Sequence, residues 1–131
     1  MKQKPLKQAV KQHWEEEVCG IRYGESSSRE EWLQEIERAR YDLEPYIHGF
    51  ADFAGASGKK VLEIGVGAGS DFANWIKNGA MSSGVDITDA AIALTKGRLN
   101  MLNIDPSHYR LTQGDAENLP FSEAEFDLVY S

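Results

Sequence analysis

The chain has 131 residues, of which 41% are hydrophobic and 10% aromatic, as expected for one ordinary folded domain. Its 14 basic and 21 acidic residues give a formal net charge of −7, which disfavours a DNA or RNA partner. One cysteine leaves no internal disulfide, and no apolar stretch has the length of a membrane span or the pattern of a signal peptide. We therefore expect a cytoplasmic protein that binds neither nucleic acid nor membrane.

The first part of the chain is predicted to be helical. Ser28 and Glu31 resemble a capping box, and Pro45 fits the first turn of a further helix. Apolar residues at helical spacing predict helices over residues 6–18, 29–43 and 45–54, with a loop at 20–27. The lysines of the N-terminus are interpreted as a solvated, frayed end: Lys2, Lys4, Lys7 and Lys11.

The remaining chain alternates between strand and helix patterns. Strands are expected at residues 60–64, 83–85, 108–113 and 126–131, and helices at 71–77 and 88–102. This order predicts an α/β fold, a Rossmann-like, doubly wound parallel sheet with ligands at the carboxyl ends of its strands. The turn at residues 55–58 divides a helical lead, residues 1–57, from the α/β core, residues 58–131, within one structural domain.

The most informative motif is a glycine-rich turn directly after the first strand. Gly65, Gly67 and Gly69 tolerate positive φ and carry no Cβ, so backbone amides can approach a ligand closely. The dinucleotide fingerprint G-x-G-x-x-G requires a glycine where this chain has Ser70, which counts against NAD. The turn is therefore a candidate cradle for another nucleotide.

Glu63 interrupts the apolar strand two residues before the turn. A buried parallel strand normally carries an apolar residue there, and a carboxylate disfavours a pyrophosphate and favours an uncharged or cationic ligand. The alternative is that Glu63 only accepts hydrogen bonds from neighbouring loop amides.

Two further acids follow strands in the same way. Asp86 closes the second strand and is a candidate acceptor for ribose hydroxyls, with Thr88 or Asp89 as the cap of the next helix; the alternative is that Asp86 itself is that cap. Asp115 follows the third strand and is a candidate acceptor for an exocyclic amine such as that of adenine, or else a self-satisfied turn residue. Ile87 is expected to pack on a base.

The motifs together resemble the class I S-adenosylmethionine-dependent methyltransferases. The resemblance rests on four segments in order over residues 60–131: residues 61–69, 84–87, 114–121 and 126–131. It implies S-adenosylmethionine as cofactor, S-adenosylhomocysteine as product and a small-molecule methyl acceptor. The cofactor-binding residues that it implies are Glu63, Gly65, Gly67, Gly69, Asp86, Ile87, Asp115 and Ala116.

The helical lead resembles that of family members whose N-terminal segment folds over the cofactor as a lid. On this resemblance Tyr23 and Tyr41 are candidates to contact the sulfonium or the carboxylate of the cofactor, with Arg22 or Arg40 pairing with that carboxylate. The alternative is that these aromatic residues belong to the core. The three histidines lack metal-ligand spacing, so no metal site is expected.

The sequence ends at Ser131, after the fourth strand, whereas the family fold has seven strands. We expect this strand to form an exposed edge that associates with a second copy, as a homodimer or larger oligomer, or with a completing chain. No catalytic residue is assigned, and activity of the 131-residue chain alone is left open. The alternative function is a non-catalytic cofactor-binding or interaction module.

Overall fold

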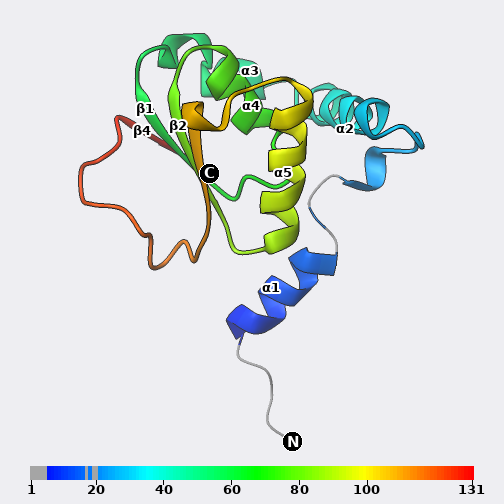
Figure 1. The fold of residues 1–131 in the computed structure, drawn as a ribbon, viewed down its shortest axis with the longest axis horizontal. Helices are drawn as coiled ribbons and strands as arrows, with labels where there is room; N and C mark the ends of the chain where they lie inside the picture. Colours follow the sequence, from blue (N-terminus) through cyan, green and yellow to red (C-terminus); the bar gives the residue numbers. More distant parts are fainter. Residues whose placement is uncertain (1–5, 17, 19–20) are drawn as a thin grey trace, which may run out of the picture.

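A computed structural model describes residues 6–16, 18 and 21–131 of the chain. Four parallel strands form one sheet: β1 (Lys60–Ile64), β2 (Met81–Asp86), β3 (Tyr109–Gln113) and β4 (Leu128–Tyr130). Their spatial order is β3-β2-β1-β4 (Figure 1). The predicted parallel α/β fold is confirmed, because every neighbouring pair in this sheet runs in the same direction.

Two helices cover one face of the sheet, α4 (Ser70–Lys77) and α5 (Asp89–Met101). Phe72 of α4 and Leu99 of α5 are both fully buried and share a cluster with Leu111 of β3. Arg110, the neighbour of Leu111, faces the other side of the sheet because side chains alternate along a strand. There it binds the hydroxyl of Ser83 and lies over the ring of Phe121, so the segment after β3 packs on this second face.

The helical lead contains α1 (Leu6–Glu16), α2 (Arg29–Leu43) and α3 (Ile47–Ala51). Ser28 caps α2 by accepting from the Glu31 amide at 3.5 Å, which confirms half of the expected capping box. The Glu31 carboxylate departs from that motif and accepts from the hydroxyl of Ser26. The expected loop at 20–27 includes a short 3-10 helix, Ile21–Tyr23, while residues 19 and 20 lie outside the described part.

The predicted helix over residues 45–54 is wrong in length. Asp52 has a left-handed backbone, with φ 51°, and this conformation ends α3 at Ala51. The Asp52 side chain then accepts from the Gly55 amide, and a separate 3-10 turn, Ala54–Ala56, follows. The strand expected at 108–113 begins one residue later, because Pro106–His108 forms another 3-10 turn that Asp105 caps.

The strand β4 lies at one edge of the sheet, next to β1, as predicted. Val129 of β4 is 57% exposed. Association through this edge stays a prediction. None of the helices in the described ranges is both long and apolar enough to span a bilayer.

Candidate functional site

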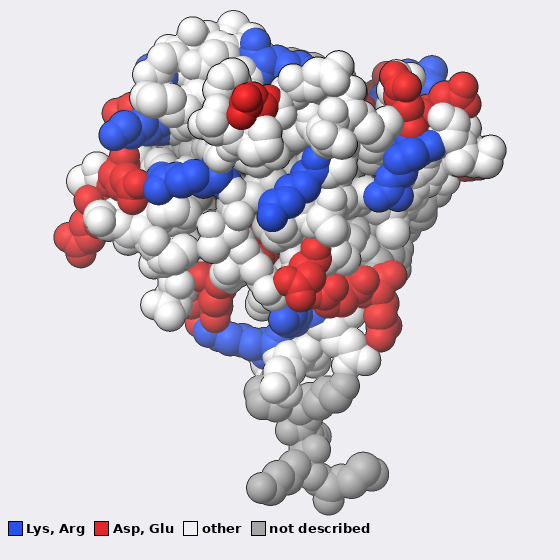
Figure 2. Space-filling model, in the orientation of Figure 1, with Lys and Arg blue, Asp and Glu red and all other residues white. Residues whose placement is uncertain are grey.

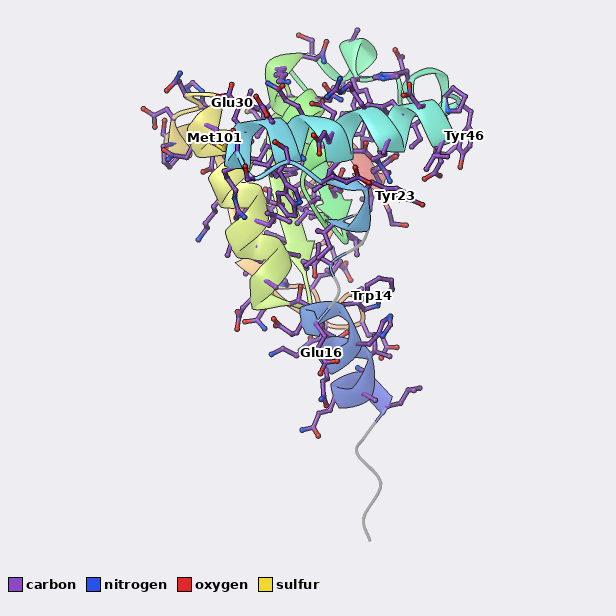
Figure 3. All side chains as sticks on the ribbon, turned by 90° about the vertical axis from the view of Figure 1, so that its right-hand side faces the viewer. Trp14, Glu16, Tyr23, Glu30, Tyr46 and Met101 are labelled. Atoms are coloured by element: carbon purple, nitrogen blue, oxygen red, sulfur yellow. The ribbon has the colours of Figure 1, made fainter. Side chains whose placement is uncertain are left out.

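Two cavities meet at the turn after β1, at the carboxyl end of the sheet. We call them the Arg40 cavity, with a volume of about 580 Å³, and the Asp86 cavity, with about 530 Å³. Gly65 and Gly67 line both, and so does Trp14 of α1. Figure 3 shows Trp14 projecting from α1 on the same side of the molecule as Tyr23, which lines the Arg40 cavity. The turn and α1 therefore form a shared wall between the two spaces.

The glycine turn needs its glycines and is fixed from behind. Gly65, Gly67 and Gly69 have φ of 79°, 56° and 82°, a region in which a side chain is unfavourable. Two buried side chains of α5 hold the turn: Thr95 donates to the Gly67 carbonyl at 3.1 Å, and Arg98 donates to the Ala68 carbonyl at 2.8 Å. The turn is therefore preformed, with its open side toward the cavities.

The Asp86 cavity combines an apolar floor with acids at its rim. Asp86, Ile87, Asp115 and Ala116 all line it, so the predicted residues at the ends of β2 and β3 come together. Ile64, Val85 and Ala91 supply apolar wall. This combination suits a flat apolar group with hydrogen-bonding substituents at its edge.

Asp86 also organises the backbone around the cavity. Its Oδ2 accepts from the Gly67 amide at 3.1 Å, and its Oδ1 accepts from the amide and hydroxyl of Thr88 at 3.0 and 2.9 Å. Thr88 in turn caps α5 by accepting from the Ala91 amide. The cap is Thr88, as predicted, and the carboxylate of Asp86 ties the glycine turn to the start of α5.

Asp115 lies at the rim with partners on both oxygens. Its Oδ1 accepts from the Glu117 amide at 2.9 Å, and its Oδ2 is 2.7 Å from Nζ of Lys7. The hydrogen bond from Lys7, then that from the Glu117 amide, lowers the pKa of Asp115 below its ordinary value. Lys7 is not frayed, since it bridges Asp115 and Glu117, although its side chain remains 55% exposed, as expected of a solvated residue; Lys2 and Lys4 lie outside the described residues.

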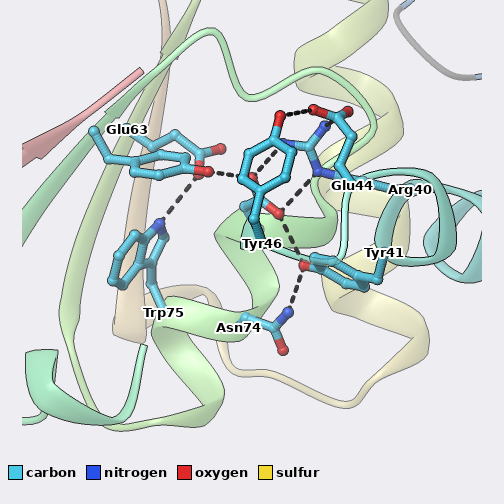
Figure 4. Close-up of polar contacts among 9 residues, drawn as sticks. Arg40, Tyr41, Glu44, Tyr46, Glu63, Asn74 and Trp75 are labelled. Atoms are coloured by element: carbon cyan, nitrogen blue, oxygen red, sulfur yellow. Dashed lines mark hydrogen bonds and ion pairs between the residues drawn. The ribbon is translucent and has the colours of Figure 1, made fainter. Parts of the chain in front are cut away.

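The Arg40 cavity contains the carboxyl of Glu63, which is buried. Burial, reinforced by the charge of Asp71, raises the pKa of Glu63 well above its ordinary value. The donor to Glu63 is the indole of Trp75 in α4, at 3.1 Å, and not an amide of the glycine turn (Figure 4). A cation entering this cavity meets a carboxyl group with a further oxygen available.

Asp71, in the first turn of α4, is the centre of a polar network that includes Arg40 and Tyr41. Figure 4 shows these two side chains of α2 side by side, facing Asn74 and Glu63. Asp71 accepts two hydrogen bonds from Arg40 of α2, at 3.0 and 2.6 Å, and one each from the hydroxyls of Tyr41 and Tyr130, at 2.8 and 3.0 Å. Burial acts to raise the pKa of Asp71, but Arg40 and the two hydroxyls outweigh it, and the net shift is downward. The network fixes α2 and β4 against the start of α4.

The two tyrosines predicted from the lead have different positions. Tyr23 lines the Arg40 cavity. Tyr41 lines neither cavity among the described residues, and its hydroxyl is engaged by Asp71 and Asn74. Of the two candidate arginines, Arg40 lines the cavity beside the glycine turn, while the side chain of Arg22 lies outside what the structure describes.

The hydroxyl of Ser70 indicates which kind of ligand group fits the Arg40 cavity. Ser70 is the first residue of α4, only 3% exposed, and its hydroxyl has no hydrogen-bond partner within the described part of the chain. It lines the cavity together with Arg40. A buried hydroxyl without a partner is costly, and helix N-termini favour anionic groups. With Glu63 also lining it, the cavity fits a group that carries both a carboxylate and an ammonium, as an amino acid does.

Sequence reasoning missed several residues of the site. Ser70 and Asp71 carried no recognised role, and the only signal for Asp71 was an acid at the start of a helix. Trp14 belonged to the segment that resembles a lid, and it lines both cavities. Lys7 was placed at a solvated terminus. The roles of Lys7 and Asp71 depend on contacts between elements far apart in the chain.

The fold and the site form a crevice of the class I methyltransferase type. Comparison with known proteins identifies the family of the chain. Residues 61–131 match the family model of the methyltransferase domain, so the chain belongs to this family, as its resemblance to class I S-adenosylmethionine-dependent methyltransferases predicted. Phthiotriol/phenolphthiotriol dimycocerosates methyltransferase 1 of Mycobacterium ulcerans is 37% identical over 63% of this chain and 29% of its own length. A fatty-acid O-methyltransferase of Mycolicibacterium smegmatis is 33% identical over 69% of this chain and 31% of its own length.

A solved structure supports the fold over nearly the whole chain. The geranyl diphosphate C-methyltransferase of Streptomyces coelicolor, in complex with Mg²⁺, geranyl diphosphate and S-adenosyl-L-homocysteine, superposes with a TM-score of 0.64. It is 19% identical, and the match covers 92% of this chain and 51% of that one. The chain thus spans about a third of the two curated relatives and half of this structure.

Proposed function

We propose that this chain forms the cofactor-binding part of an S-adenosylmethionine-dependent methyltransferase. The observation that carries the proposal is the pair of cavities joined at the glycine turn, because their chemistry differs as the two halves of this cofactor do. The Asp86 cavity is apolar with acids at its rim, whereas the Arg40 cavity has a buried hydroxyl, a guanidinium and a buried carboxyl. Family membership supports the same assignment.

In this proposal the adenosine half occupies the Asp86 cavity. Asp86 accepts from the ribose hydroxyls, Ile87 packs on the base and Asp115 accepts from its amine, with Ala116 as a neighbouring backbone group. Each of these residues lines the cavity. The amino-acid half occupies the Arg40 cavity, with its carboxylate toward Ser70 and Arg40 and its ammonium toward Glu63.

The chemistry that the cofactor supplies when bound is an activated methyl group on a cationic sulfur. The protein's contribution is then to hold donor and acceptor in position and to exclude water. Such positioning accounts for about 7–11 kcal/mol of barrier reduction in well-oriented reactions. The glycine turn suits this role because Asp86, Thr95 and Arg98 fix it before any ligand arrives.

We propose a small-molecule acceptor that approaches through the Arg40 cavity. Two relatives are named as methyltransferases of phthiotriol dimycocerosates and of fatty acids, which are apolar molecules. The cavity has apolar wall from Ile36 and Leu43 beside its polar groups. Apolar wall of this kind accommodates hydrocarbon next to a reacting polar group.

Calorimetric titration with S-adenosylhomocysteine tests the proposal, with NAD as the contrasting ligand. We expect binding of S-adenosylhomocysteine and none of NAD. Asp86→Asn should weaken binding about 10- to 100-fold, because a charged acceptor is lost from the ribose contacts. Asp89→Asn is the matched control, since Asp89 is exposed, lies three residues further along at the start of α5 and lines neither cavity among the described residues.

Two outcomes would contradict parts of this assignment. Absence of heat with S-adenosylhomocysteine, in a chain that circular dichroism shows to be folded, would refute cofactor binding. Binding without methyl transfer to fatty acids and related lipids, in the longest form of the protein that can be produced, would favour the non-catalytic module.

A further inference from the structure

The helix α1 is attached to the rest of the protein by charged groups near both of its ends. Near the first end, Nζ of Lys7 lies 2.7 Å from carboxylate oxygens of both Asp115 and Glu117. Near the other end, the Glu15 carboxylate accepts from the amides of Asp89 and Ala90, at 2.7 and 3.2 Å, at the start of α5. Glu15 lies eight positions after Lys7, which is about 12 Å along a helix. The helix thus spans the mouth of the Asp86 cavity.

Apolar packing contributes little to this attachment. Leu6, Val10 and Trp14 recur at four-residue spacing and line the Asp86 cavity, yet they remain 80%, 40% and 39% exposed. No described residue of α1 is buried. An 11-residue helix without such packing is marginal on its own, so its position depends on the ionic contacts at its ends.

The contact with Lys7 occupies the carboxylate of Asp115, which the proposed function needs for ligand binding. Asp115 is the rim carboxylate proposed for the adenine amine, and its Oδ2 is engaged by Lys7. Figure 2 shows acidic side chains gathered around basic ones where the lower end of the molecule meets α1. The cation of α1 therefore sits at the entrance to the cavity and competes with the ligand for the same carboxylate.

We propose that Lys7 is the latch of a gate: its contacts with Asp115 and Glu117 hold α1 closed over the Asp86 cavity, and cofactor entry requires them to break. This inference rests on the proposed function. It adds a control point to the lid, because the rate of cofactor entry then depends on an exposed ion-pair contact, which salt screens.

Association kinetics test the latch in the full chain. S-adenosylhomocysteine is the ligand of choice because it carries no net charge, so salt acts on the protein and not on long-range attraction. Stopped-flow tryptophan fluorescence should show that Lys7→Gln associates about two- to tenfold faster than the wild type, the range expected when two weak exposed pairs are lost. Raising the salt concentration should accelerate the wild type and leave Lys7→Gln unchanged.

Lys11→Gln is the matched control, because it makes the same charge change on α1 and Lys11 lines neither cavity in the described structure. Hydrogen exchange without ligand gives a second measurement: amides of residues 6–16 should exchange faster in Lys7→Gln than in the wild type or Lys11→Gln. Equal association and exchange rates in the two variants would overturn the latch while leaving cofactor binding intact. Failure of the wild type to bind S-adenosylhomocysteine would instead refute the proposed function and, with it, the gate.

Discussion

Three glycines with similar positive φ allow the structural and ligand-related roles of the glycine turn to be separated. Gly58, Gly65 and Gly69 have φ of 76°, 79° and 82°. Alanine in this region costs about 1–2 kcal/mol at each position. Any further difference in stability or ligand affinity between the three alanine variants must come from the atoms that surround the added methyl group.

The surroundings of the three positions differ. A Cβ at Gly58 or Gly65 would have no heavy atom within 4 Å, whereas at Gly69 it would lie 2.8 and 2.9 Å from side-chain atoms of Thr95. Thr95 is fully buried and bonded to the Gly67 carbonyl, so it has little room to move. Overpacking of this kind costs about 1–3 kcal/mol more. Gly69→Ala should therefore destabilise the fold by about 2–5 kcal/mol, against about 1–2 kcal/mol for the other two.

The loss of ligand affinity should follow a different order among these variants than the loss of stability. The methyl of Gly65→Ala points into open space where both cavities meet, and the proposed cofactor has to cross this point. We expect at least a roughly tenfold loss of S-adenosylhomocysteine affinity, since displacing the ligand costs contacts on both sides. Gly58 lines neither cavity, so Gly58→Ala should bind as the wild type does.

Urea unfolding and calorimetric titration measure the two effects separately. A Gly65→Ala variant with full affinity would refute the idea that the ligand crosses the turn. A Gly69→Ala variant no less stable than Gly58→Ala would show that Thr95 yields to the added methyl group.

Further predictions concern the buried groups around the site. The pKa of Glu63 is raised above its ordinary 4.5, so the folded state binds this proton more tightly than the unfolded chain, and stability falls as pH rises through the folded pKa. Glu63→Gln should therefore have a larger free energy of unfolding than the wild type at neutral pH. In urea unfolding this free energy should also fall less between pH 5 and 8 than that of the wild type, and equal falls in the two proteins would contradict the reasoning. Arg40→Leu removes two bonds from the buried Asp71 carboxylate and should cost about 1–3 kcal/mol by the same measurement, with no change in stability as the contrary result. Leu99→Ala should cost about 2–5 kcal/mol in thermal denaturation, while Leu102→Ala, 41% exposed, should stay within about 0.5 kcal/mol; similar losses in both would contradict the assigned burial.

Much of the fold was predictable because its signals are local. The helix over residues 29–43 was predicted from a cap and an apolar stripe, and both lie within one turn or one face of the segment. The positions of Asp86 and Asp115 at strand ends followed from the alternation of strands and helices. In parallel sheets that alternation brings successive carboxyl ends to one edge.

The polar contacts of the site were not predictable in the same way. Asp71 receives its hydrogen bonds from Arg40, Tyr41 and Tyr130, which lie 31, 30 and 59 residues away. These contacts depend on the rotation of α2 about its axis and on the register of β4 against β1. No local sequence pattern indicates either of them. The failed helix extension past Ala51 has a different, local origin, since Asp52 takes a left-handed conformation and accepts from the Gly55 amide three residues later.

The charges of the crevice are largely balanced within the protein. Asp71 is neutralised by Arg40 and Asp115 by Lys7, while Asp86 is satisfied by the amides of Gly67 and Thr88. Burial favours the protonated form of the fourth acid, Glu63. A cationic ligand therefore does not meet four open carboxylates. At the rim it has to replace an internal partner, and Lys7, whose side chain is 55% exposed, is bound there by Asp115 and Glu117. This balance fits the proposed cofactor, whose amine can take the place of Lys7 at Asp115.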